Sequence, residues 1–208
     1  MKTEIIPQES TRAYAFEMWM KSPMPMVTLV KTLDITRLVK VSRKTGMKLN
    51  MLMCWCIGKA ARDIEEFYIM PEQGKLFRYD RLAINAIVPN HKGGINSCDI
   101  PFSDDLQRFN QDYQELTAQA ASECKNTSLE DCAVIGTSAV IQTELDTIVN
   151  QYSGIFNNPF LAWGKYRKGL FKTTLPVSLQ FHHVKMYGYQ AATFLQRLQD
   201  EIKKVRNE

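Results

Sequence analysis

Two adjacent histidines near the C-terminus are the residues of this chain best suited to acid or base chemistry. They lie in the segment LPVSLQFHHVKMYG, residues 175–188, where apolar and polar side chains alternate up to the histidine pair. This alternation predicts a strand with His183 on the face of Val177, Leu179 and Phe181, and with Ser178, Gln180 and His182 on the other face. An imidazole among apolar groups keeps a neutral nitrogen available as a base, because burial disfavours the charged ring. On alternation alone, a core histidine bonded to a backbone carbonyl is the more common case.

The remaining ligating and nucleophilic residues form no recognisable cluster. The close pair among the five cysteines, Cys54 and Cys56, has C-x-C rather than C-x-x-C spacing. We therefore expect reduced structural thiols and no metal site built by the protein. His91 lies beside a turn that contains Gly93 and Gly94, and this turn lacks the spacing of a nucleotide-binding loop.

Composition and charge limit the class of protein. The 208 residues are 45% hydrophobic and 23% charged, which predicts one folded domain over residues 1–208. Lys and Arg number 26 against 22 Asp and Glu, a net charge of +4 without dense basic tracts, so no nucleic-acid partner is expected. The N-terminal residues lack the apolar core of a secretory signal, and no apolar run approaches a membrane span. We expect a cytoplasmic protein with no membrane partner.

The elements alternate between helical and strand-like periods, which predicts an α/β layered domain. A short first helix has Tyr14, Met18 and Lys21 on one stripe and ends before Pro23. Strands are expected over 26–33, 133–141 and 160–163, with a strand meander over 68–99. Helices are expected from Thr36 to Lys44, over the periodic apolar residues 53–67, from Ser103 onward, and over residues 191–205.

The C-terminal third resembles the chloramphenicol acetyltransferases, whose signature is a strand ending in H-H-x-x-x-D-G followed by a helix. The matching segments are Gly164-Lys-Tyr166, Leu175-Pro176, Gln180-Phe-His-His183 and the stretch GYQAATFLQRLQ from Gly188 to Gln199. Near the N-terminus, Arg12, Phe16-Glu17 and Leu33-Asp-Ile-Thr36 are similar and have the same spacing. The resemblance covers most of the chain and is weakest between Pro71 and Asn150.

This resemblance implies a homotrimer of α/β subunits, each a two-layer sandwich in which helices cover a central mixed β-sheet. It implies active sites at subunit interfaces, where acetyl-CoA and a small hydroxyl acceptor enter from opposite sides. His183 would be the general base that takes the acceptor's proton as its oxygen attacks the thioester. No acyl-enzyme and no metal are implied.

One departure lies at the signature aspartate, where this chain has Tyr187, followed by the expected Gly188. In the family that carboxylate pairs with the arginine that matches Arg12. A tyrosine cannot neutralise a guanidinium, so Arg12 is expected to find another anion or to reach water.

A second departure concerns the serine that stabilises the oxyanion in the family motif I-S-A-x-P-W. Aligned without a gap from His183, Gly136 takes its place, whereas a two-residue deletion puts Ser138 there. Ser138 is the preferred oxyanion donor, with Gly136 as the open alternative. A satisfied hydroxyl at the end of a strand is the simpler interpretation of Ser138.

A third departure lies on the acceptor side, where residues 87–97 differ from the family's Glu-Thr-x-Thr-Phe-Ser. Met18, Met24, Met26 and Phe102 could line an apolar acceptor pocket, although a methionine-rich core is the more common explanation of such residues. Lys165 and Tyr166, with the basic residues that follow them, could face the phosphates of CoA, or form a solvated turn.

Two hypotheses give the histidine pair a role, and a third, a plain assembly protein without a ligand, would leave it unexplained. The leading one is an acetyl-CoA-dependent O-acetyltransferase for chloramphenicol or a related xenobiotic alcohol, that is, an antibiotic-resistance enzyme. The alternative is a catalytically impaired trimeric homologue that binds CoA or a small ligand in a regulatory or sequestering role, motivated by Tyr187 and the uncertain serine.

Overall fold

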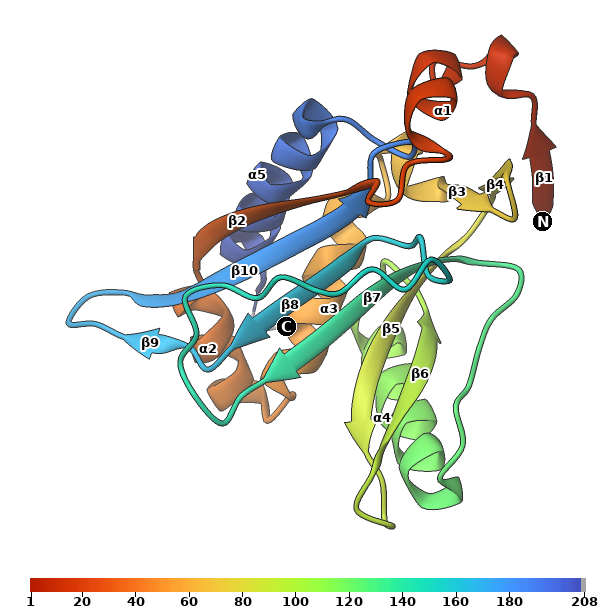
Figure 1. The fold of residues 1–208 in the computed structure, drawn as a ribbon. Helices are drawn as coiled ribbons and strands as arrows, with labels where there is room; N and C mark the ends of the chain where they lie inside the picture. The colour runs from red at the N-terminus through yellow and green to blue at the C-terminus, as the bar shows by residue number, and fades with distance from the viewer. Residues whose placement is uncertain (207–208) are drawn as a thin grey trace.

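A seven-stranded mixed sheet is the frame of the chain, described here for residues 1–206 from a computed structural model (Figure 1). Its order is β2-β10-β8-β7-β5-β6, and a short β9 also pairs with β10. The pairs β5/β7 and β7/β8 are parallel and all others are antiparallel. The strands are β2 (Met26–Asp34), β5 (Leu82–Pro89), β6 (Ile95–Pro101), β7 (Ala133–Val140), β8 (Phe160–Gly164), β9 (Arg167–Lys168) and β10 (Thr173–His182).

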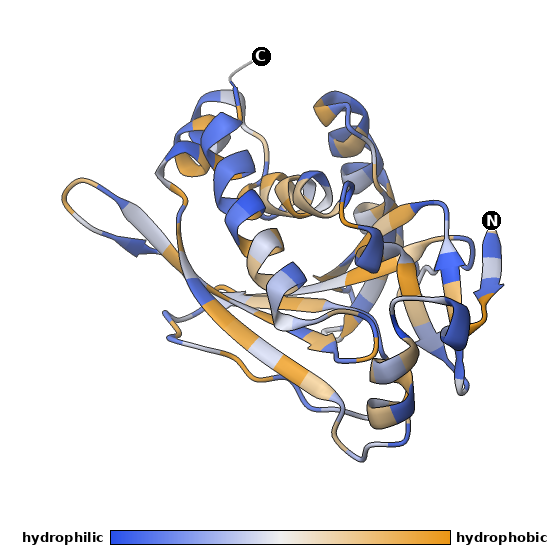
Figure 2. Cartoon of the chain, turned by 90° about the horizontal axis from the view of Figure 1, so that it is seen from above, coloured by the Kyte–Doolittle hydropathy of each residue, from blue (hydrophilic) through white to orange (hydrophobic). Residues whose placement is uncertain are grey.

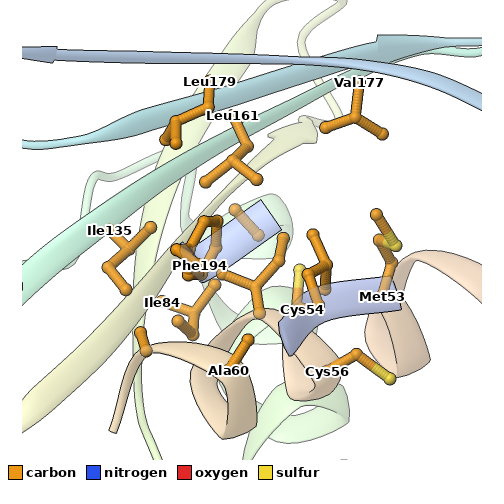
Figure 3. Packing of buried hydrophobic residues seen from close by; sticks show 14 of the residues in the cluster. Met53, Cys54, Cys56, Ala60, Ile84, Ile135, Leu161, Val177, Leu179 and Phe194 are labelled. Carbon is orange, nitrogen blue, oxygen red and sulfur yellow. The ribbon is translucent and has the colours of Figure 1, made fainter. Parts of the chain in front are cut away.

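Helices cover one face of this sheet, which confirms the expected two-layer α/β architecture (Figure 2). They are α2 (Thr36–Thr45), α3 (Leu49–Ala61), α4 (Leu106–Glu123) and α5 (Gly188–Lys204). Helix α2 ends at Gly46, whose φ of 76° is the left-handed exit that its position predicted. Val177 and Leu179 of β10 and Leu161 of β8 point toward α3, and Phe194 of α5 fills the space between them (Figure 3). This alternation along β10 is the one that the sequence predicted.

Two differences in helix bounds have a clear local cause. The helix expected over residues 53–67 ends at Ala61, and Phe67 lies in a short 3₁₀ turn, η2 (Glu65–Tyr68). The chain tightens there because the amide of Ile64 bonds to the carbonyl of Ala61. Helix α4 starts at Leu106, because the Asp105 carboxylate, rather than the Ser103 hydroxyl, accepts the capping bond from the Arg108 amide at 3.0 Å.

A smaller sheet of order β1-β4-β3 packs beside the end of β10, together with helix α1 (Ala13–Trp19) and a 3₁₀ turn, η1 (Pro7–Glu9). Its strands are β1 (Lys2–Ile5), β3 (Ile69–Glu72) and β4 (Lys75–Tyr79). A small apolar cluster joins Ile69 and Leu76 of this sheet to Val184, with Phe16 and Trp19 of α1 packed against it. The turn that follows β10 is therefore held by N-terminal elements distant in sequence.

The second face of the main sheet is covered by the extended segment 141–159 between β7 and β8. Ser178 of β10 accepts a hydrogen bond from the Ile148 amide at 3.0 Å, and Gln180 donates to the Asn150 carbonyl at 2.9 Å. Both side chains are buried as a result. Several apolar side chains of β7 and this segment remain exposed: Val140, Ile141, Val149, Ile155 and Phe156.

Candidate active site

His183 lies at the point where β10 ends and the chain turns toward α5. The strand ends at His182, one residue earlier than the alternation suggested, and the His183 amide bonds to the Pro25 carbonyl at 2.8 Å. This bond continues the pairing of β10 with β2 for one residue. His183 is half-buried, so its imidazole is fixed by its surroundings and still reachable from outside.

Two aromatic rings hold the imidazole of His183. The Trp19 indole stacks on it with ring centroids 5.1 Å apart and planes inclined by 27°. The Tyr187 ring meets it edge-on at 5.6 Å. Within residues 1–206, Nδ1 of His183 is buried without a hydrogen-bond partner. The ring is therefore positioned by stacking and by its backbone rather than by a side-chain hydrogen bond.

Arg12 does neither of the things that the sequence led us to expect. It is 2% exposed, it pairs with no carboxylate among residues 1–206, and its guanidinium lies 4.1 Å above the centre of the Tyr187 ring. Its one side-chain hydrogen bond there is a long one, 3.4 Å, to the Lys185 carbonyl. The Tyr187 ring thus receives the arginine on its π face.

Lys185 anchors the turn that carries His183, and the sequence analysis missed it. Its side chain is fully buried, and Nζ donates to the Phe67 carbonyl at 3.1 Å and contacts Sδ of Met70 at 3.2 Å. Burial lowers the pKa of this amine well below its usual value. A second basic side chain, Arg12, is buried close to the same turn.

His182 is structural. It is 1% exposed, and its Nδ1 accepts the Val184 amide at 3.2 Å, which tightens the turn. Burial, with a smaller contribution from the neighbouring His183, lowers the pKa of His182 to about 4. Such a ring is neutral at physiological pH and is already occupied by a backbone donor.

The first turn of α5 completes the local frame. Tyr187 precedes Gly188 at the helix start, and the Tyr187 amide donates to Oε1 of Gln190 at 3.1 Å. Gln190 in turn donates to Glu66 at 3.0 Å. These contacts fix Tyr187 between His183 and Arg12.

The missed residue Trp19 lies on a helical stripe that the sequence does contain. Arg12, Phe16 and Trp19 recur at intervals of four and three residues and form the inner side of α1. The stripe of Tyr14 and Met18, which the sequence analysis selected, is the exposed side: Tyr14 is 67% exposed and Met18 51%. Lys185 gave no comparable signal, because a lysine in a turn normally lies in solvent.

The expected acceptor-side residues do not form one group. Met24 and Met26 flank Pro25 and so lie beside His183, with Met24 exposed and Met26 half-buried. Phe102 follows β6 at the opposite edge of the sheet, where its ring packs against Gly58 of α3 and Phe109 of α4. Within one protomer, Phe102 and His183 do not share a pocket.

The two candidate oxyanion positions are also distant from His183 in the same protomer. Ser138 lies level with Ser178, two strands away from it, and Ser178 comes five residues before His183. The Cα atoms of Ser138 and His183 are therefore roughly 19 Å apart. Gly136 is two residues nearer that end of the sheet, but a Cβ there would lie 2.3 Å from the Phe160 ring and 3.0 Å from Nδ2 of Asn158. Either position meets a histidine only if a second copy supplies it.

Lys165 and Tyr166 lie at the other end of the sheet. Trp163 pairs with Val177, so Lys165 is about eight strand residues, roughly 26 Å, from His183 in one protomer. Lys165 is exposed and Tyr166 half-buried. Only a long ligand or a neighbouring copy could bring these residues to the same reaction.

The assembled site is an imidazole held between aromatic rings, with a buried cation behind one of them. A neutral, partly exposed imidazole can accept a proton from a hydroxyl group, and a net positive site favours a transition state that develops negative charge. A cysteine nucleophile is not indicated: all five thiols are free, and burial raises the pKa of Cys54 to about 12. None of the described helices is both long and apolar enough to cross a membrane.

Comparison with known proteins gives one consistent result. The protein-family model described as chloramphenicol acetyltransferase matches residues 3–199. Chloramphenicol acetyltransferase 3 of Escherichia coli is 23% identical over 179 residues, covering 83% of this chain and 84% of that protein. Chloramphenicol acetyltransferase 2 of the same organism is also 23% identical, over 177 residues and 83% of each chain.

Solved structures agree at the level of the fold. A chloramphenicol acetyltransferase superposes with a TM-score of 0.83 at 17% identity, covering 97% of this chain and all of the other. A probable dihydrolipoamide acetyltransferase from Listeria monocytogenes superposes with a TM-score of 0.71 at 13% identity, covering 99% and 95%.

Proposed function

The chain belongs to the chloramphenicol acetyltransferase family, and on that premise we propose that it transfers the acetyl group of acetyl-CoA directly to a hydroxyl group of a small molecule. Membership of this family supports an acyltransferase activity. The donor, the acceptor group and the catalytic residues are our proposal. The observation that carries it is the placement of His183, half-buried at the end of β10 and held between Trp19 and Tyr187. This is the position and the fixed orientation that a general base needs.

In the proposed reaction, an imidazole nitrogen of His183 takes the proton of the acceptor hydroxyl while its oxygen attacks the thioester carbonyl carbon. The resulting tetrahedral oxyanion collapses, the carbon–sulfur bond breaks, and the imidazolium returns the proton to the CoA thiolate. Protons and charges balance without an acyl-enzyme. Base catalysis of this kind contributes on the order of 10² to 10⁴ in rate.

Tyr187 and Arg12 support the base without a carboxylate. The buried Arg12 guanidinium lies over the Tyr187 ring, and the plane of the same ring is inclined by 67° to the His183 imidazole. We therefore propose that the stack Arg12–Tyr187–His183–Trp19 does the positioning that the aspartate does in the family pattern. Gly188 then starts α5 directly behind it.

A homotrimer with interfacial sites fits the separation of the proposed groups. Ser138, the proposed oxyanion donor, cannot reach His183 of its own protomer, and the Phe102 ring packs between α3 and α4 at the other edge of the sheet. The exposed apolar residues of segment 141–159 supply a surface for a neighbouring copy to cover. We propose that each site combines His183 of one protomer with Ser138 and acceptor-binding residues of the next.

Chloramphenicol or a related xenobiotic alcohol is the proposed acceptor, which would make the chain an antibiotic-resistance enzyme of the cytoplasm. The names of the two Escherichia coli relatives and the aromatic and methionine side chains around His183 support this choice. Lys165 and Tyr166 are proposed to hold the phosphate and adenine end of acetyl-CoA, whose long pantetheine arm separates that end from the thioester.

The test is release of the CoA thiol from acetyl-CoA with chloramphenicol and a panel of other hydroxylated compounds. We expect turnover with at least one acceptor and an O-acetylated product by mass spectrometry. Turnover with another alcohol but not with chloramphenicol would change the proposed acceptor and support the proposed acetyl transfer. Acetyl-CoA binding without turnover on any acceptor would refute the proposed activity and favour the catalytically impaired homologue. The Phe160 ring that covers Gly136 is also consistent with that homologue, because it leaves no room for an oxyanion-binding side chain there.

A further inference from the structure

The hairpin that joins β9 to β10 ends in two consecutive apolar side chains that contact almost nothing. Leu170 is 97% exposed and Phe171 is 91% exposed. They are the central residues of a tight turn, closed by the Gly169 amide bonding to the Lys172 carbonyl at 2.8 Å. Turns of this kind favour glycine, asparagine and serine, so local propensity does not explain leucine and phenylalanine here.

The hairpin projects beyond the body of the subunit. Figure 1 shows it beyond the end of the main sheet, and Figure 2 shows its tip in the hydrophobic colour. Its base is fixed, because the Thr173 amide donates to the Thr36 hydroxyl at 2.8 Å and β9 pairs with β10. The two apolar side chains are thus presented on a braced support.

Positive charge surrounds the tip. Lys168 and Lys172 flank it directly, Lys165 lies just behind, and all three are exposed. Among residues 1–206, none of these three ammonium groups forms an ion pair, whereas Arg167 at the base is paired with Asp146 and Glu144. The lysines without an ion pair therefore lie nearest the apolar tip, and the ion-paired Arg167 lies farther back.

We propose that this hairpin docks reversibly on an anionic lipid bilayer, with Leu170 and Phe171 inserted at the boundary between headgroups and acyl chains. The inference rests on the oligomer of the proposed function but not on its chemistry, and it revises the expectation of no membrane partner. Lysines one or two residues behind an inserted apolar tip lie at the level of the lipid phosphates, where each basic residue adds to binding.

The shape of the tip favours a bilayer over a protein partner. A stable protein interface buries about 800 Å² on each side, far more than two side chains on a narrow loop can offer. Lipid acyl chains, in contrast, can pack around a small inserted apolar group of any shape. One such wedge binds weakly, so several hairpins of an oligomer would have to act together.

The experiment is co-sedimentation of the full chain with phosphatidylglycerol-containing vesicles and with pure phosphatidylcholine vesicles. We expect binding to the anionic vesicles that weakens as salt is added, and little binding to the neutral ones. The double variant Leu170→Ser/Phe171→Ser should lower the bound fraction about tenfold or more, and Lys168→Gln/Lys172→Gln should lower it and flatten the salt dependence. These side chains are exposed, so the fold is not at risk.

Ile95→Ser is the matched control, because Ile95 is 70% exposed beside the tip of the β5–β6 hairpin. It should bind like the unmodified protein. Equal binding of the Leu170→Ser/Phe171→Ser variant, or no binding of the unmodified chain to anionic vesicles, would overturn the proposal. Loss of the oligomer in that variant, measured by light scattering, would instead assign the tip to a second copy of the chain and would equally overturn it.

Discussion

Replacing Tyr187 by leucine or phenylalanine separates the roles of its ring and its hydroxyl. The ring carries the Arg12 guanidinium at 4.1 Å, and Arg12 is 2% exposed with a single long hydrogen bond. A desolvated cation–π contact is worth about 2 kcal/mol. Phenylalanine keeps the ring that contacts Arg12 and His183 and removes only the hydroxyl. We expect Tyr187→Leu to lower the free energy of unfolding by about 2 kcal/mol and Tyr187→Phe to change it by less than about 0.5 kcal/mol.

Urea unfolding of both variants, alone and combined with Arg12→Met, measures this contact directly. The double-mutant cycle should return a coupling free energy of about 2 kcal/mol between Tyr187 and Arg12. A control cycle that mutates the exposed Tyr14 together with Arg12 should return a coupling close to zero. Because Tyr187 also meets His183, Tyr187→Leu should lower kcat roughly ten- to a hundredfold with KM little changed. Equal stability and equal kcat for the leucine and phenylalanine variants would refute the stacking argument.

Two further predictions concern the turn after β10. Burial lowers the pKa of Lys185, so between that pKa and the ordinary one the unfolded chain binds more protons than the native chain, and stability rises with pH. The free energy of unfolding of Lys185→Met should therefore exceed that of the unmodified chain most at low pH, and the excess should shrink as the pH of the urea titrations rises toward 10.5. A difference in unfolding free energy that does not change with pH would contradict this. His182 has its pKa lowered from 6.5 to about 4, so the native chain should lose about 3 kcal/mol as pH falls through that interval. His182→Asn keeps an acceptor for the Val184 amide and cannot be protonated there, so it should be spared that loss, and a parallel acid decline in both proteins would exclude His182 as its cause.

The sequence predicted best those elements whose residues repeat with one clear period. The alternation from Val177 to Phe181 identified β10 and its two faces, and the spacing of apolar residues identified α4 and α5. Each of these elements has one buried side, so its period appears directly in the chain. The start of α4 differs from the expected one because a specific hydrogen bond, from the Arg108 amide to the Asp105 carboxylate, decides it.

The site was predicted only at its centre. His183, Arg12 and Tyr187 lie together in the structure, but the stack between them could not be foreseen, because it depends on how α1 approaches the turn after β10. Trp19 belongs to a short helix with apolar residues on both sides, so periodicity left its inner side ambiguous. Ser138 illustrates a different limit: only the strand order and directions show that it lies far from His183 in one protomer.

The most direct test of the account is kcat for CoA thiol release by His183→Ala, compared with His91→Ala, which removes an exposed histidine far along the chain. The account predicts that His183→Ala loses a factor on the order of 10² to 10⁴ in kcat while its unfolding curve and oligomeric state stay close to those of the unmodified protein. His91→Ala should be fully active. A folded His183→Ala protein that keeps most of its turnover would contradict the central claim that this imidazole is the general base.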